Sequence, residues 1–244
     1  TVSESQVRFS ELYDGEVYDA TFVPQEITSA VCFDGPTDTL IPQEGESIRE
    51  QERICAARIF TTPKGERVID FGQELTGFLE VNLDAKAGEV VDVSFAEVLD
   101  KEGNFYTENY RGAKCRYHYT CRDGQQTYKT KLTFYGFRYI RVNEFPGGVE
   151  QADQSSFTGI AVHSQMKRTG HIRTSDAMLN QLFSNIIWGQ KSNFVDVPTD
   201  CPQREKNGWT ADAALSSEAA LLNYDPECNY REWLRNICKA QRGD

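Results

Sequence analysis

The chain has 244 residues, of which 39% are hydrophobic and 11% are aromatic, and its formal net charge at pH 7 is −11. This composition is typical of a globular protein with room for one large or two modest domains. The acidic balance, without a basic stripe to offset it, argues against nucleic acids and anionic membrane surfaces as partners, whereas a neutral glycan is compatible with it. No segment approaches the roughly 20 apolar residues of a membrane span.

The chain has seven cysteines and three histidines, and neither set has the spacing of a disulfide framework or of a zinc site. Because the number of cysteines is odd, at least one of them is free. Buried thiols that pack as small hydrophobic groups are the simplest interpretation. We therefore expect no metal ion and no cofactor.

The first elements in chain order are predicted to be strands. A short strand-like segment at 15–20 is followed by a polar, Pro- and Gly-marked segment at 36–46, which is typical of a linker. Further along, hydrophobic residues alternate with polar ones at 78–83 and 89–95, which flank a turn at 87–88. Segments 114–121 and 136–142 continue this pattern. Strands at such spacing predict an antiparallel β-sandwich.

Aromatic residues are frequent in this β-region, and two interpretations are open. They could form a stacking platform of a carbohydrate-binding module, or they could fill the core of the sandwich. Tyr117 and Tyr119 would share one face of a strand, which is normal for a core and favours the second interpretation. The full set is Phe105, Tyr106, Tyr110, Tyr117, Tyr119, Phe134, Tyr135, Phe137 and Tyr139.

Beyond about residue 170 the hydrophobic pattern changes to a helical period. Ser175 is a candidate N-cap of a first helix, which would continue to about Asn193 and end before the prolines that follow. One face of this helix is apolar and consists of Met178, Leu179, Leu182, Phe183, Ile186 and Ile187.

Two more helices are predicted after the first. One begins near Thr210 or Ala211 and ends at Leu222, and the other covers about 229–240. The last helix would turn three side chains inward: Trp233, Leu234 and Ile237.

The loop between the first two helices carries three carboxylates, a guanidinium and an indole. Asp200 and Asp212, if close, would disfavour ionisation of Glu205 and keep it protonated as a general acid. Arg204 would act against this unless it points at Asp200 or at a sugar hydroxyl. Trp209 could stack on a pyranose ring. The same pattern also fits a solvated connection in which Trp209 anchors inward, and Asp212 could simply be an N-cap.

Cys201, in the same loop, offers a second kind of chemistry. A nucleophilic cysteine needs a nearby base, usually His, and a lowered pKa. His171 is the nearest histidine in the sequence, and it precedes the first helix. We therefore rank a cysteine hydrolase below a sugar-cleaving enzyme.

The whole motif resembles the active-site signature of the bacterial α-L-rhamnosidases. It runs Asp-Cys-Pro-Gln-Arg-Glu-Lys at 200–206, then Gly-Trp at 208–209 and Asp212, and it departs from the usual pattern at Ala211, where the family usually has Gly. The β-region also resembles this family in six segments that follow the family's order. They are 70–73, 77–78, 95–100, 104–109, 134–139 and 162–164.

The resemblance implies the fold and the domain limits. Residues 1–50 would be the end of a preceding β-domain and a linker, 51–165 a β-sandwich of the concanavalin-like kind, and 166–244 the first helices of an (α/α)6 six-hairpin barrel. Three helices cannot close such a barrel, so the remainder of the catalytic domain would lie outside this chain.

The resemblance also implies the chemistry, which is hydrolysis of terminal α-L-rhamnose with inversion. Glu205 would be the proton donor, and Asp200, Arg204, Trp209 and Asp212 would surround the sugar. The general base of the family lies in a later barrel loop, so this chain alone should have little or no activity. The substrate would be a rhamnose-containing glycan or glycoside, and another sugar for the same barrel is the alternative.

The natural rhamnoside, the linkage and the oligomeric state are not fixed by the sequence. The compartment is also open, with a periplasmic or secreted location favoured over a cytoplasmic one for an enzyme that degrades glycans.

Overall fold

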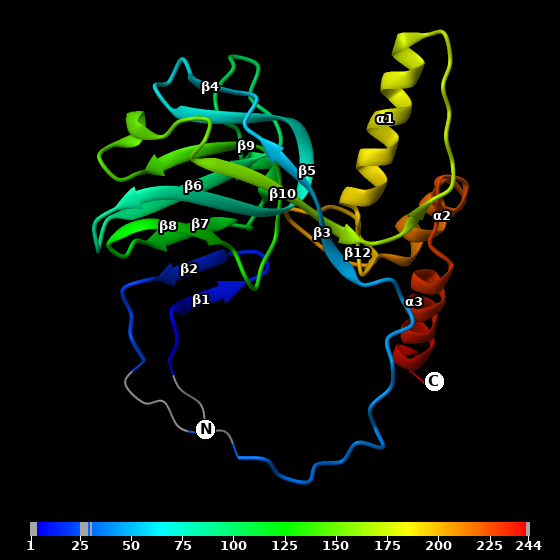
Figure 1. Cartoon of the computed structure of the whole chain (residues 1–244). Helices are drawn as coiled ribbons and strands as arrows, with labels where there is room; N and C mark the ends of the chain where they lie inside the picture. Colours follow the sequence, from blue (N-terminus) through cyan, green and yellow to red (C-terminus); the bar gives the residue numbers. More distant parts are fainter. Residues whose placement is uncertain (1–3, 25–28, 30, 243–244) are drawn as a thin grey trace.

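The computed structural model describes residues 4–24, 29 and 31–242, and it consists of a body of β-strands beside three helices (Figure 1). The strands of the body are β1 (Val7–Glu11), β2 (Gly15–Asp19), β3 (Ile48–Cys55), β4 (Arg58–Thr61), β5 (Arg67–Ala85), β6 (Val90–Ala96), β7 (Arg116–Thr120), β8 (Gly124–Lys129), β9 (Tyr135–Glu144) and β10 (Phe157–Ser164). Two 3-10 turns, η1 (Glu108–Tyr110) and η2 (Val149–Gln151), interrupt the loops.

These ten strands form one hydrogen-bonded sheet in the order β1-β2-β7-β6-β9-β5-β10-β3, with β4 and β8 also paired to β5. Strand β5 has 19 residues and joins the parts of the sheet: its first half pairs with β4 and β9, and its second half pairs with β8 and β10. The sheet therefore curls around one core. The pairs are antiparallel, as the alternating pattern predicts, with the exception of the parallel pair β2 and β7.

The core of this body is aromatic. Phe95 stacks on Tyr135 with ring centroids 3.9 Å apart, and Phe137 meets Phe95 and Phe71 edge to face. Of the nine aromatic residues that could have formed a sugar-binding platform, seven are buried: Phe105, Tyr110, Tyr117, Tyr119, Tyr135, Phe137 and Tyr139. The platform interpretation is therefore wrong for these seven, because their rings pack inside the sheet.

The N-terminal hairpin is attached to the edge of the sheet. Strand β2 pairs with β7, and the buried carboxylate of Glu16 accepts hydrogen bonds from the backbone N–H groups of Lys131 and Leu132 and from the hydroxyl of Tyr128. Residues 31–47 then run as an exposed segment without strand or helix, as the polar linker pattern predicts (Figure 1). The end of this segment contacts the last helix, where Gly45 N–H donates to Glu232.

The three helices follow the body in chain order, as predicted. They are α1 (Ala177–Ser192), α2 (Thr210–Asn223) and α3 (Glu227–Ala240), and the short strands β11 (Lys167–Arg168), β12 (Phe194–Val195), β13 (Val197–Pro198) and β14 (Tyr224–Asp225) connect them. No helix in the described part of the chain has the length and apolarity to cross a membrane.

Two details of the helices differ from the prediction. The N-cap of α1 is Asp176 and not Ser175, because the Asp176 carboxylate accepts hydrogen bonds from the N–H groups of Met178 and Leu179. In α3, Trp233 is buried as expected, but Leu234 is mostly exposed.

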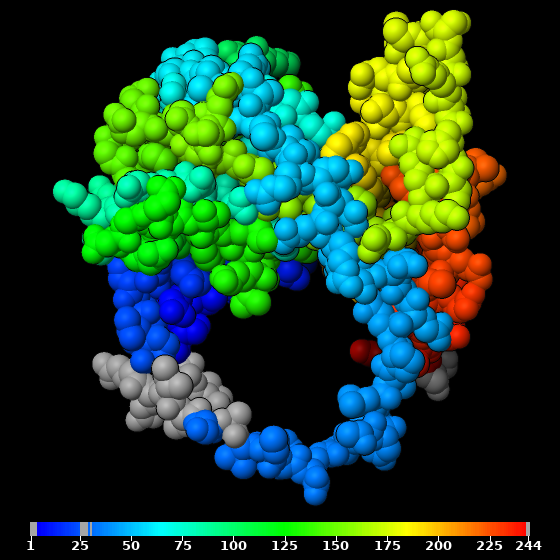
Figure 2. Space-filling model, in the orientation of Figure 1, coloured from blue at the N-terminus to red at the C-terminus, as the bar shows by residue number. Residues whose placement is uncertain are grey.

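The apolar faces of the helices are open. Among the apolar residues of α1, Ile187 is buried, whereas Met178, Leu179, Leu182 and Ile186 are exposed. Figure 2 shows α1 standing clear of the β-body over much of its length. Leu215 on α2 is 87% exposed. Apart from the cluster around Ile187 and Phe183, much of the apolar surface of α1 and α2 therefore has no partner among the described residues.

Candidate active site

The motif loop, residues 200–207, connects β13 to α2 and is closed by its own backbone. Asp200 N–H donates to Asn207 O at 3.0 Å, Lys206 N–H donates to Cys201 O at 3.0 Å, and Asn207 N–H donates to the Asp200 carboxylate at 3.1 Å. Pro198 and Pro202 flank the start of this turn and prevent a helix there. The acidic residues at positions 200 and 205 are therefore held on one compact loop.

Hydrogen bonds attach this loop to the β-body. The Lys206 ammonium group donates to the backbone carbonyls of Leu12 and Phe134, and Tyr13 Oη donates to the carbonyl of Glu205 at 2.6 Å. The thiol of Cys115 donates to the carbonyl of Gln203. Burial lowers the pKa of Lys206 to about 8. The loop is thus attached to residues that lie far away in the sequence.

Residues with strained backbone conformations lie at the contact between the motif loop and the β-body. Three non-glycine residues there have positive φ angles, which are 54° at Arg111, 45° at Cys115 and 53° at Lys206. Such conformations cost free energy, and they persist where the surrounding contacts enforce them. The loop at 105–115 and the motif loop are therefore fixed in shape by their mutual packing.

Glu205 lies at the surface of this contact, and its carboxylate is 26% exposed. One oxygen, Oε1, accepts a hydrogen bond from Arg111 Nη1 at 2.9 Å, and the other, Oε2, accepts one from the indole N–H of Trp209 at 3.1 Å. Trp209 is 51% exposed, so it is not the inward anchor of the alternative interpretation. Its ring remains available to a ligand beside Glu205.

Asp200 and Glu205 are neighbours, as the sequence predicts. Ligand atoms of Asp200, Cys201 and Glu205 all lie within 4.8 Å of one another. Partial burial acts to raise the pKa of Asp200, but hydrogen bonds from the N–H groups of Asn207 and Cys201 outweigh it and lower the pKa below its usual value. Asp200 is therefore an ionised neighbour of Glu205.

Cys201 has neither of the features of a nucleophile. Its thiol donates to the Asp200 carboxylate at 3.4 Å, and burial raises its pKa. A protonated thiol is a poor nucleophile and a poor metal ligand. These contacts favour a structural role for Cys201, and they do not favour metal binding by the group it forms with Asp200 and Glu205.

Arg204 points towards the β-body. Its Nη1 donates to the carbonyl of Asn109 at 3.2 Å, and its Nε lies 3.8 Å from Glu205 Oε1. Glu97 on the β-body accepts hydrogen bonds from Asn109 and Gln203 and is also attracted to Arg204. Burial raises the pKa of Glu97, against the effect of these partners.

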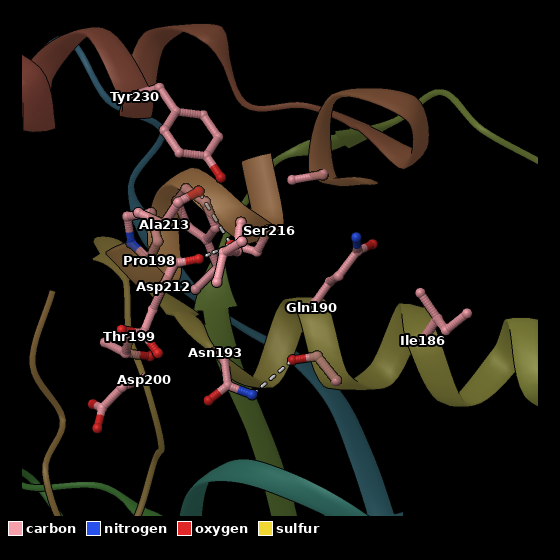
Figure 3. Close-up of a pocket in the computed structure, with 14 residues that line it drawn as sticks. Ile186, Gln190, Asn193, Pro198, Thr199, Asp200, Asp212, Ala213, Ser216 and Tyr230 are labelled. Carbon is pink, nitrogen blue, oxygen red and sulfur yellow. Dashed lines mark hydrogen bonds between the residues drawn. The ribbon is translucent and has the colours of Figure 1, made fainter. Parts of the chain in front are cut away.

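A cavity of about 450 Å³ opens between α1, α2 and α3, next to the motif loop (Figure 3). Asp200 and Asp212 line it on one side, and Gln190 and Ile186 of α1 line it on the other. Asp212 is in the first turn of α2, and its side chain is not the N-cap, since the N-cap is Trp209. A carboxylate in a first helical turn is favoured by the helix dipole.

The five predicted residues therefore divide into two groups. Asp200 and Asp212 face the cavity, whereas Glu205, Trp209 and Arg204 lie along the contact with the β-body. Sequence reasoning missed the partners from the β-body, namely Tyr13, Glu97, Asn109 and Arg111. Glu97 and Asn109 do lie inside segments that resemble the family, which is the one signal that could have found them.

Comparisons with known proteins match most of the β-body and the helical region separately. Residues 60–163 match the model of the bacterial alpha-L-rhamnosidase concanavalin-like domain, and residues 167–244 match that of the bacterial alpha-L-rhamnosidase 6 hairpin glycosidase domain. Among curated proteins, an alpha-L-rhamnosidase from Streptomyces avermitilis is 35% identical over 91% of this chain, and one from Alteromonas sp. is 34% identical over 98%. The chain spans 20% and 27% of these two relatives.

Solved structures agree with these matches. The crystal structure of the Streptomyces avermitilis alpha-L-rhamnosidase complexed with L-rhamnose has a TM-score of 0.88 and 32% identity. The matched region covers 98% of this chain and 24% of the Streptomyces chain. The alpha-L-rhamnosidase from Dictyoglumus thermophilum has a TM-score of 0.85 and 31% identity. The chain belongs to the bacterial α-L-rhamnosidase family and comprises its concanavalin-like domain followed by part of its six-hairpin glycosidase domain.

Proposed function

We propose that the natural protein containing this chain hydrolyses terminal α-L-rhamnose from glycosides or polysaccharides with inversion of configuration. The observation that carries the proposal is the motif loop, in which Glu205 lies beside Asp200 and the exposed ring of Trp209. The Streptomyces relative, whose structure contains L-rhamnose, supports the choice of sugar.

In this proposal Glu205 donates the proton to the glycosidic oxygen as the bond to the sugar breaks. Asp200 and Asp212, on one wall of the cavity, accept hydrogen bonds from sugar hydroxyls. Trp209 packs against the apolar face of the pyranose ring. Arg204 contributes a positive charge at the edge of the site, since its Nε lies 3.8 Å from Glu205 Oε1.

Inversion also requires a base that activates water on the opposite face of the sugar, about 6.5 to 9.5 Å from the acid. Asp200 is too close to Glu205 for this role, because their carboxylate oxygens lie within 4.8 Å. We therefore propose that the base comes from outside residues 1–244 and that this chain alone has little or no activity. The open apolar faces of α1 and α2 would then be covered by further barrel helices.

The test is hydrolysis of an α-L-rhamnoside with a poor leaving group, such as methyl α-L-rhamnoside, by the natural protein and by its Glu205→Gln variant, with Glu218→Gln as the control. Glu218 is an exposed carboxylate on α2. We expect Glu205→Gln to lower kcat by roughly 100-fold or more, the range of general acid catalysis, and Glu218→Gln to leave it unchanged. Proton NMR of the first rhamnose anomer released reports inversion or retention. Full activity in Glu205→Gln would refute the assignment.

The same assay tests the alternative sugar. If the natural protein cleaves an aryl glycoside of another sugar and not the rhamnoside, and Glu205→Gln abolishes that activity, the barrel and its donor are retained while the substrate is revised. Purified residues 1–244 should show no turnover, and turnover that Glu205→Gln abolishes would contradict the proposal that the base lies elsewhere.

A further inference from the structure

The contact between Arg111 and Glu205 joins the two domains at the site of proton donation. Arg111 belongs to the concanavalin-like domain and directly follows η1, whereas Glu205 is in the motif loop, and their Nη1 and Oε1 atoms are 2.9 Å apart. The side chain of Arg111 is 67% exposed. The contact lies at the rim of the site, where a substrate could reach the carboxylate without displacing packed residues.

The backbone around Arg111 is held in place. Tyr110 Oη donates to the carbonyl of Gly136 at 2.8 Å from a buried position, and Asn109 Nδ2 donates to Glu97. Arg111 itself has φ 54° and ψ −116°, a conformation that L residues rarely adopt. Strain of this kind is found where neighbouring contacts enforce it, often at functional sites. The loop therefore presents the guanidinium from a fixed position.

Several charged or titratable groups face the Glu205 carboxylate. Asp200 and Cys201 approach from the motif loop, and Arg204 lies 3.8 Å away in the same loop. Arg111 approaches from the concanavalin-like domain, and Trp209 supplies a neutral donor. Arg111 is thus the cation in hydrogen-bond contact with Glu205, while Arg204 is engaged with Asn109.

We propose that Arg111 is a positioning residue for the proton donor, a role that rests on the proposed function of Glu205. In the step, the Glu205 proton moves to the glycosidic oxygen, and the C–O bond breaks with its electron pair going to that oxygen. Water supplies the hydroxyl group of the released sugar, and its other proton goes to the general base. Glu205 is left as a carboxylate. Arg111 fixes one oxygen of that carboxylate and stabilises its negative charge, so proton donation becomes more favourable.

This role predicts a dependence on the leaving group. A poor leaving group, such as the alcohol of a methyl α-L-rhamnoside, needs the proton, whereas 2,4-dinitrophenolate departs without it. Loss of the guanidinium should therefore lower kcat for the alkyl rhamnoside by roughly two- to five-fold, the range of a partly exposed ion pair. Cleavage of the dinitrophenyl rhamnoside should not change.

The experiment compares Arg111→Gln, Arg111→Lys and Lys114→Gln in the natural protein. Lys114 is a matched control, since it is an exposed cation three residues away that pairs with Asp14 and not with the motif loop. We expect Arg111→Gln to slow hydrolysis of the alkyl rhamnoside and to leave that of the dinitrophenyl rhamnoside unchanged. Arg111→Lys should restore the rate for the alkyl rhamnoside, and Lys114→Gln should behave as the unmodified protein.

The outcomes separate this inference from the proposed function. If the unmodified protein hydrolyses α-L-rhamnosides through Glu205 but Arg111→Gln lowers the rate equally for both leaving groups, or leaves the rate for the alkyl rhamnoside unchanged, then the positioning role is overturned and the function stands. If the unmodified protein hydrolyses no α-L-rhamnoside, the proposed function fails first. Loss of the folded state in Arg111→Gln would be seen as a lowered Tm, and Arg111→Lys then decides the charge effect by itself.

Discussion

The β-body and the helical region use their apolar residues in opposite ways. The curled sheet buries Leu75, Leu79, Phe95 and Phe137 completely among its own strands, whereas α1 and α2 leave most of their large apolar side chains exposed. Both regions have the amphipathic periodicity that predicts burial. The difference teaches that periodicity identifies the face that will be covered, and that the covering element need not be in the same segment of chain.

The largest effect should come from the core of the sheet. Phe137→Ala removes a fully buried ring from the cluster with Phe71 and Phe95, and we expect it to lower the free energy of unfolding by about 3–5 kcal/mol. Leu215→Ala on α2 should change it by less than about 0.5 kcal/mol, because this side chain is 87% exposed. Urea unfolding of residues 1–244 measures both. Similar losses for the two variants would show that the helical face is covered in solution.

An intermediate effect is expected at the contact between the two regions. A Cβ atom at Gly136 would lie 2.5 Å from Pro202 Cγ in the motif loop, so Gly136→Ala must push the loop away from the sheet. Overpacking of this kind costs about 1–3 kcal/mol. Gly112→Ala is the control, because its Cβ would meet nothing within 4 Å. Equal Tm values for the two variants would contradict the close approach of the loop.

The smallest effect concerns Glu52 on β3, which joins the sheet to α1. Partial burial opposes its ionisation, but the nearby His163 ring, whose Nε2 lies 3.6 Å from the carboxylate, and a hydrogen bond from the buried Lys191 outweigh this and lower the pKa of Glu52 to about 2. Glu52→Gln should lower the free energy of unfolding by about 1 kcal/mol at pH 7, a discounted value because the carboxylate is 41% exposed.

The sign of the pH dependence follows from the lowered pKa. Ionised Glu52 stabilises the fold fully above the unfolded value of 4.5, and this contribution is lost as the pH falls towards 2. The gap between the unmodified chain and Glu52→Gln should therefore be constant above pH 5 and close below it. The control is Glu50→Gln, on the same strand as Glu52, which breaks an exposed pair between Glu50 and Lys129 of β8. A gap that persists at pH 2 would exclude the ion pair as its cause.

Local elements could be predicted well from the sequence. Segment 229–240 was expected to be helical, and α3 covers Glu227–Ala240; segment 89–95 was expected to be a strand, and β6 covers Val90–Ala96. The full length of β5 was missed, because Gly72 and Gly77 interrupt its alternating pattern. Gly77 is required there, since a Cβ atom would lie 1.8 Å from the carbonyl oxygen of Ile160.

The candidate site was predicted in part. Asp200 and Glu205 come together because one short loop carries both, which a linear motif captures. The partners of Arg204 and Glu205 could not be predicted, because Asn109 and Arg111 lie about 95 residues earlier and reach the loop only through the folding of the sheet. The roles of the five site residues towards a sugar stay predictions.

Lys206 shows how the motif loop can tolerate change in the domain that supports it. Its ammonium group donates to the main-chain carbonyls of Leu12 and Phe134, and the hydroxyl of Tyr13 donates to the carbonyl of Glu205. Every residue type has a main-chain carbonyl, so the acceptors at positions 12 and 134 survive substitution of their side chains. Substitutions that change only these two side chains should therefore leave the attachment of the motif loop to the β-body in place.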